Sequence, residues 1–121
     1  MRARYTRVST SNQNMERQLA KEYADNQIFT DIVSGSVPFS ERQEGKLLLQ
    51  KIENKEITYL SVKAIDRLGR NLYDITNTLK VLENNNVCLK VDSLGLASIV
   101  NGKKNPTFNL IMSVMANVDQ M

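Results

Sequence analysis

Short β-forming runs alternate with stretches of helical periodicity along the whole chain, and this alternation limits the possible folds more than any other feature. The strongest β-forming run is Ile57–Ile65, which lies between two stretches whose apolar residues recur every three or four positions. The expected strands are 2–9, 28–30, 56–65 and 87–91, and the expected helices are 14–25, 44–54, 73–83 and 107–121. In the second helix Leu47, Leu48 and Ile52 are expected to face inward, and the segment 92–105 is expected to be a loop. Strands that alternate with helices of this length indicate an α/β sheet with parallel strands and right-handed crossovers.

The residue types that the chain lacks exclude several kinds of catalytic and metal site. It contains no histidine, which excludes a Ser-His-Asp triad and most zinc sites, and its single cysteine excludes an internal disulfide. No apolar run reaches membrane-spanning length and no signal-peptide pattern is found, so a cytoplasmic location is the default expectation. A length of 121 residues suits one domain, and the net charge of +3 is compatible with nucleic acid as a partner.

Two of the expected strands end in unusual polar groups. The first ends in Arg7 and Ser9, whose side chains should share one face of the strand with Tyr5, which we expect to be a packing residue. The run over 56–65 leads into a charged loop that contains glycine, Asp66–Asn71. Because the carboxyl ends of parallel strands meet at one edge of a sheet, we expect the two segments to lie close together.

This combination of residues suits phosphoryl transfer without a metal ion. The candidates are the hydroxyl of Ser9, the guanidinium groups of Arg7, Arg42, Arg67 and Arg70, and the carboxylate of Asp66. Arginine binds phosphate oxygens through paired hydrogen bonds and stabilises the charge that develops on them. Arg42 follows a Gly/Pro/Ser-containing loop over 34–40, expected to be mobile, and could swing over the same crevice. On the residues alone, Ser9 could equally belong to the polar run Ser9–Asn12 that caps the following helix, and the arginines could be ordinary surface charges.

At this point the chain resembles the catalytic domain of the serine site-specific recombinases, the resolvase/invertase family. The resemblance is carried by Tyr5-Thr6-Arg7-Val8-Ser9-Thr10 with Gln13, by Glu16-Arg17-Gln18-Leu19, by Ser34-Gly35 followed by Arg42, and by Ile65-Asp66-Arg67-Leu68-Gly69-Arg70-Asn71. It covers nearly the whole chain and implies a three-layer α/β/α resolvase-like fold with a mostly parallel sheet. One departure is that Gln43 follows Arg42 where the family usually has proline.

The resemblance also implies a division of labour. Ser9 would attack a scissile DNA phosphate to give a 5′-phosphoserine link, and the four arginines would clamp that phosphate. Asp66 would orient or protonate the reacting groups, and Gln13 and Gln18 would support the site. Proteins of this family act on double-stranded DNA as homodimers that pair into tetramers, and they need no cofactor and no metal.

The last expected helix begins at Pro106, a residue that suits the first turn, and is apolar on one broad side. Phe108, Ile111, Met112, Met115 and Val118 form that side, and Leu110, Val114 and Met121 widen it. By resemblance we expect a catalytic domain over 1–105 and the start of a long oligomerisation helix over 106–121. The C-terminal DNA-binding domain of the family is expected to be absent, since Asp119-Gln120-Met121 stands where the family's longer helix would continue.

Two other functions remain open on the sequence. One is a truncated, non-catalytic dimerisation module that regulates full-length recombinases. The other is a small-molecule receiver or nucleotide-binding domain with a similar sheet. The second is disfavoured because no glycine-rich phosphate loop follows the first strand and no acidic cluster is available for magnesium.

Overall fold

A computed structural model of the chain describes residues 1–10 and 13–120, with side chains described up to residue 115. The expected helix-capping residues Ser11 and Asn12, the side chain of Val118 and the whole of Met121 therefore lie outside the described residues. The strands are β1 (Arg2–Val8), β2 (Gln27–Ile32), β3 (Tyr59–Val62), β4 (Cys88–Val91), β5 (Leu96–Ala97), β6 (Ile99–Val100) and β7 (Lys103–Lys104). The helices are α1 (Gln13–Glu22), α2 (Gln43–Glu53), α3 (Leu72–Asn84) and α4 (Pro106–Gln120), with short 3-10 turns η1 (Phe39–Glu41), η2 (Ile65–Leu68) and η3 (Asp92–Leu94).

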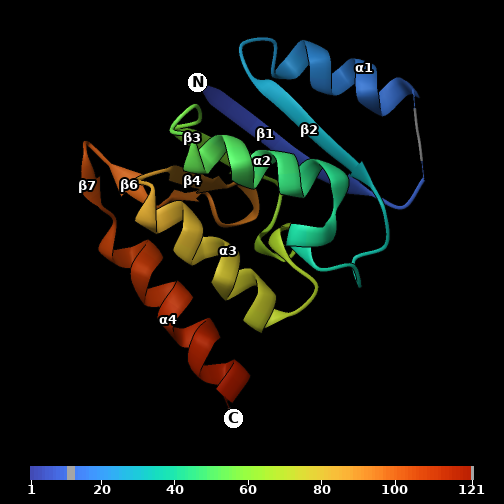
Figure 1. Cartoon of the computed structure of the whole chain (residues 1–121). Helices are drawn as coiled ribbons and strands as arrows, with labels where there is room; N and C mark the ends of the chain where they lie inside the picture. The colour runs from blue at the N-terminus through green and yellow to red at the C-terminus, as the bar shows by residue number, and fades with distance from the viewer. Residues whose placement is uncertain (11–12, 121) are drawn as a thin grey trace.

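Five of the strands form one mostly parallel sheet in the order β2-β1-β3-β4-β5 (Figure 1). The β1–β2, β1–β3 and β3–β4 pairs are parallel, and only β5 runs antiparallel to its neighbour. This confirms the α/β fold class expected from the alternation of strands and helices. The four parallel strands, β1 to β4, consequently end at the same edge of the sheet, which we call the C-terminal edge.

The core lies between the sheet and the helices α2 and α3. Strand residues at alternate positions, such as Tyr5 and Leu60, are fully buried there against Leu48 and Ile52 of α2 and Leu82 of α3. Burial of this apolar surface is what holds the two helices on the sheet.

A thinner layer lies on the opposite face of the sheet. The side chain of Arg4 is buried on that face, where its guanidinium lies 4.5 Å from the ring centre of Tyr23, just beyond α1. Arg4 also forms an ion pair with Asp92 at 2.8 Å. Helix α1 contains no fully buried residue, and its apolar side chains Met15 and Leu19 are half-buried.

Three expectations about local structure were wrong in detail. The strand expected over 56–65 is shorter, because the chain turns into η2 at Ile65. The segment expected as a loop over 92–105 contains β5 and a β6–β7 hairpin. Its two-residue turn, Asn101-Gly102, has positive φ at both positions, the geometry that an Asn-Gly pair favours. Leu47, expected to face inward, is exposed.

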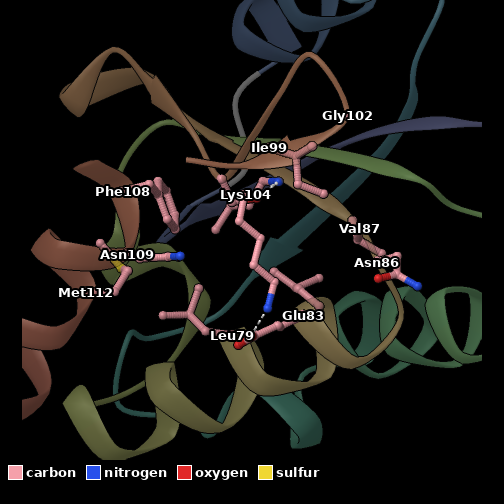
Figure 2. A pocket seen from close by; sticks show the side chains of 13 residues that line it. Leu79, Glu83, Asn86, Val87, Ile99, Gly102, Lys104, Phe108, Asn109 and Met112 are labelled. Atoms are coloured by element: carbon pink, nitrogen blue, oxygen red, sulfur yellow. Dashed lines mark hydrogen bonds and ion pairs between the residues drawn. The ribbon is translucent and has the colours of Figure 1, made fainter. Parts of the chain in front are cut away.

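Helix α4 packs along α3 and the β6–β7 hairpin, and the three elements enclose a mainly apolar cavity of about 310 Å³ (Figure 2). Phe108 and Met112 of α4 face Leu79 of α3 across this cavity. An ion pair between Lys104 and Glu83, 3.0 Å long, connects the hairpin to α3 at the same place. No helix in the described part of the chain is long and apolar enough to cross a membrane.

Candidate active site

The two polar strand ends meet at the C-terminal edge of the sheet, as expected. Ser9 follows the last residue of β1 directly and is exposed, while η2 follows β3 after two residues and carries Asp66 and Arg67. Since β1 and β3 are adjacent parallel strands, their ends lie side by side, and β1 contacts η2 directly. The structure therefore places the end of β1, which leads into Ser9, beside the start of the charged loop.

Arg42 is the most deeply buried charged residue of this region, with only 1% of its surface exposed. One of its guanidinium nitrogens, Nη1, donates to the carbonyl of Arg67 at 2.7 Å and to the hydroxyl of Tyr5 at 3.2 Å. The other two donate to the carbonyls of Val37 and Gly35, at 3.0 and 3.4 Å. The expectation that Arg42 lies free beyond a mobile loop and swings over the crevice thus differs from the structure, in which this arginine joins β1, the 34–40 loop and η2.

The buried carboxylate of Asp31 holds Tyr5 and the start of α2 in place. The hydroxyl of Tyr5 donates to Oδ2 of Asp31 at 2.9 Å, and the two carboxylate oxygens accept from the backbone N–H groups of Glu44 and Gly45 at 2.8 and 2.9 Å. Those two N–H groups belong to the first turn of α2, so Asp31 caps this helix from a neighbouring strand. Burial raises the pKa of Tyr5 well above its ordinary value, although Arg42 opposes the shift, so the phenol stays protonated and can donate to Asp31.

Arg7 lies at the end of β1, beside the 34–40 loop. Its Nη1 donates to the carbonyl of Val33 at 3.1 Å, and its guanidinium lies 3.5 Å from the point where a Cβ on Gly35 would be. Its Nε is buried and has no hydrogen-bond partner among the described residues. Arg7 is therefore a half-buried cation two residues before Ser9, with one buried donor that lacks a partner among the described residues.

The loop that carries Arg70 is fixed by a cap at the start of α3. Asn71 accepts from the backbone N–H of Asp74, and Oδ2 of Asp74 accepts from the N–H groups of Arg70 and Phe39, at 2.8 and 3.0 Å. Gly69 is required by this close approach, because a Cβ there would lie 2.7 Å from the backbone nitrogen of Ile75. The loop backbone is held tightly while the Arg70 side chain stays exposed.

A family model described as "Resolvase, N terminal domain" matches residues 2–121 of this chain. The chain belongs to the resolvase family. Among curated relatives it is similar to a resolvase/recombinase of Pseudomonas putida, with 31% identity over 97% of this chain and 64% of the relative. It is also similar to the transposon Tn501 resolvase of Pseudomonas aeruginosa, with 34% identity over 92% of this chain and 56% of the relative. The chain thus spans less than two thirds of the length of these relatives.

Solved structures of the same family share the fold. The N-terminal catalytic domain of TP901-1 integrase superposes with a TM-score of 0.74 at 24% identity, over 98% of this chain and 93% of that chain. A serine recombinase from Sulfolobus solfataricus superposes with a TM-score of 0.57 at 29% identity, over 74% of this chain and 68% of that chain. These structures support the resolvase-like α/β architecture expected from the sequence.

The remaining candidate residues of this resolvase-family chain lie at the surface. Asp66 is exposed in η2, and Gln13 is exposed at the first position of α1. Gln18 is also exposed, and its amide donates to Glu22 one turn later in the same helix, at 2.9 Å. No group of three or more His, Cys, Asp or Glu residues is placed to hold a metal ion in the part of the chain that the structure describes. The roles of these three residues stay predictions.

Sequence reasoning missed two carboxylates, Asp31 and Asp74. Each had a weak signal. Asp31 lies two positions after Phe29, directly after the predicted strand 28–30, and would share the inward face of Phe29 if that strand continued. Asp74 lies three positions after a potential N-cap, Asn71. Tyr5 was expected to be a packing residue, and it packs against Phe39 while also donating to Asp31.

We expect Tyr5→Phe to lower the free energy of unfolding by about 1–2 kcal/mol at pH 7, because Asp31 and Arg42 each lose a partner. The folded state holds the Tyr5 pKa above its ordinary value of 10.0, so its contribution is complete below pH 10 and is lost as the pH rises further. The stability gap between the two proteins should therefore narrow above pH 10. Urea unfolding at pH 7 and pH 10.5 measures both effects.

The matched control is Tyr73→Phe, because Tyr73 is 70% exposed and its change should be nearly neutral. Equal stability of Tyr5→Phe and the wild-type protein would show that the buried hydroxyl does not stabilise the fold.

Proposed function

We propose that this resolvase-family chain is a catalytic domain that cuts and rejoins double-stranded DNA in site-specific recombination, with Ser9 as the nucleophile. The observation that carries the proposal is the exposed Ser9 at the C-terminal edge of the sheet, next to the segment that bears Asp66, Arg67 and Arg70. The family match over residues 2–121 supports recombination as the reaction class.

In the proposed reaction the Ser9 hydroxyl oxygen attacks the phosphorus of a DNA phosphodiester. A bond from that oxygen to phosphorus forms, the bond from phosphorus to the 3′ oxygen breaks, and the proton lost by Ser9 is balanced by one gained at the 3′ oxygen. The products are a 5′-phosphoserine link and a free 3′-hydroxyl, which can attack the link to reseal the strand. Because one phosphodiester replaces another, the cycle requires no external energy source and no cofactor.

The arginines divide into two groups in this proposal. Arg7, Arg67 and Arg70 keep part of their side chains accessible and would bind the phosphate oxygens, which become more negative in the transition state. Arg42 is buried and would act by fixing the backbone of Arg67 and the hydroxyl of Tyr5. Asp66 would orient the reacting groups or protonate the 3′ oxygen, and Gln13 and Gln18 would support the DNA from α1.

The partners we propose are DNA and further copies of the same chain. Leu110 and Val114 lie one turn apart on α4 and are 66% and 54% exposed, so they form an apolar stripe turned away from the protein's own core. Such a stripe fits the corresponding helix of a second copy, giving a homodimer that pairs into a tetramer during strand exchange. Residues 1–105 would then be the catalytic domain and 106–121 the start of the oligomerisation helix, in a cytoplasmic protein.

Ser9→Ala should abolish covalent capture of DNA while leaving the fold intact, because only the attacking oxygen is removed. The measurement uses the chain fused to a DNA-binding module of known site and a nicked duplex, with the protein–DNA adduct resolved on a denaturing gel. An adduct that persists in Ser9→Ala would remove Ser9 from the nucleophile role. No adduct from the unmodified chain would favour the alternative of a non-catalytic dimerisation module.

Arg70→Lys should lower the rate of adduct formation by about 100-fold, because a single ammonium cannot reproduce the planar, paired hydrogen bonds of a guanidinium. The same assay, followed over time, gives the rate. Arg2→Lys is the matched control, since Arg2 begins β1 at the opposite edge of the sheet. A rate within a few-fold of the unmodified protein would contradict a phosphate-binding role for Arg70.

The double variant Leu110→Asp with Val114→Asp should weaken self-association at least tenfold, because two charges would be buried without partners in the apolar contact. Sedimentation velocity over a range of protein concentrations measures the association. Thr107→Asp, an exposed change in the first turn of α4, is the control and should associate normally. Unchanged association of the double variant would place the interface elsewhere.

A further inference from the structure

The outward face of α3 carries four exposed residues that the proposed reaction does not use. They are Tyr73, Asn77, Lys80 and Asn84, and their spacing of four, three and four positions aligns them along one side of the helix. Tyr73 is 70% exposed, the largest exposure of any large hydrophobic residue in the described chain. We call these four residues the outer face of α3.

The outer face offers cationic and neutral hydrogen-bonding groups but no carboxylate. Helix α3 contains two acidic residues, and both are turned to other partners. Asp74 accepts from the backbone of Arg70 and Phe39, and Glu83 pairs with Lys104 on the side of the helix that faces the cavity (Figure 2). Lys80 forms no ion pair with any residue that the structure describes. The one charge on this face is therefore positive, which is the sign that contact with a polyanion requires.

The outer face is also continuous with the candidate active site. Helix α3 begins two residues after Arg70, at the C-terminal edge of the sheet, and runs away from that edge toward the β6–β7 hairpin (Figure 1). The stretch from Tyr73 to Lys80 rises by about 10 Å along the helix. Each strand of a DNA duplex presents one phosphate per about 3.4 Å of its axis, so a segment of this length can follow about three phosphates.

We propose that the outer face of α3 binds the sugar–phosphate backbone of the DNA duplex that flanks the scissile phosphate. Lys80 binds a phosphate, Asn77 donates a hydrogen bond to the backbone, and Tyr73 packs against a deoxyribose next to the phosphate held by Arg70. Contacts of this kind position DNA without reading its sequence. The proposal rests on the DNA-cleaving function proposed above, and it assigns the helix a task that the cleavage reaction itself does not need.

The test measures binding of the chain to a non-specific, fluorescently labelled duplex by anisotropy at several salt concentrations. Lys80→Gln should weaken binding about three- to tenfold at low salt and reduce the slope of log affinity against log salt by about 0.9, because one phosphate contact is lost. Lys55→Gln is the matched control: it removes the same charge from an exposed site before β3, at the opposite edge of the sheet, and should leave the slope unchanged.

Tyr73→Ala should weaken binding about threefold without changing the slope, because the lost contact is uncharged, whereas Tyr73→Phe should bind like the unmodified chain. Wild-type affinity and slope in Lys80→Gln would overturn the proposal, and so would a complete lack of DNA binding by the unmodified chain. The Ser9→Ala capture assay reports separately on cleavage. If the chain forms the adduct but Lys80→Gln does not change the salt slope, the cleavage function is supported and this DNA-binding surface is not. If Lys80→Gln reduces the slope but no adduct forms, the surface is supported and the cleavage function is not.

Discussion

The structure depends on a buried chain of hydrogen bonds that runs from Asp31 through Tyr5 to Arg42. Asp31 is 3% exposed, and such a carboxylate is stable in the core only because the first turn of α2 supplies two N–H groups and the positive end of the helix dipole. The Tyr5 hydroxyl in turn accepts a hydrogen bond from Arg42. Arg42 also donates to backbone carbonyls of the 34–40 loop and of η2. One strand residue thereby fixes the positions of a helix, a loop and the Arg67 backbone.

This arrangement explains why one arginine is buried while others stay accessible. Arg42 is surrounded by carbonyl and hydroxyl oxygens, so its charge is satisfied by neutral acceptors and it acts as a structural tie. Arg70 lies in the segment that the Asp74 cap holds in place, and the side chains of Arg7 and Arg70 remain half-buried and exposed, respectively. For the phosphoryl transfer proposed above, a site built in this way is organised before substrate arrives, which lowers the reorganisation that the reaction requires.

Much of this could be predicted from the sequence, and the exceptions have physical reasons. Local periodicity located the four helices and the parallel strands, since those patterns reflect which face of each element is buried. The β6–β7 hairpin was missed although its Asn101-Gly102 pair is a strong turn signal, because its strands are only two residues long. The burial of Arg42 could not be predicted, because its acceptors are backbone carbonyls from segments far apart in the chain. Leu47 was predicted to be buried and is exposed, because a single apolar residue on a helix can face solvent without destabilising the fold.

Helix α4 is joined to the rest of the domain in a different way from α2 and α3. None of the hydrogen bonds that connect Asp31, Tyr5, Arg42 and Asp74 in the described residues involves α4, which packs through Phe108 and Met112 beside a cavity of about 310 Å³. Phe108 is buried in the main core and Met112 packs against that core, so apolar contacts hold α4 on the rest of the domain. The geometry of the candidate site therefore depends on contacts that do not include the surface proposed to join two copies.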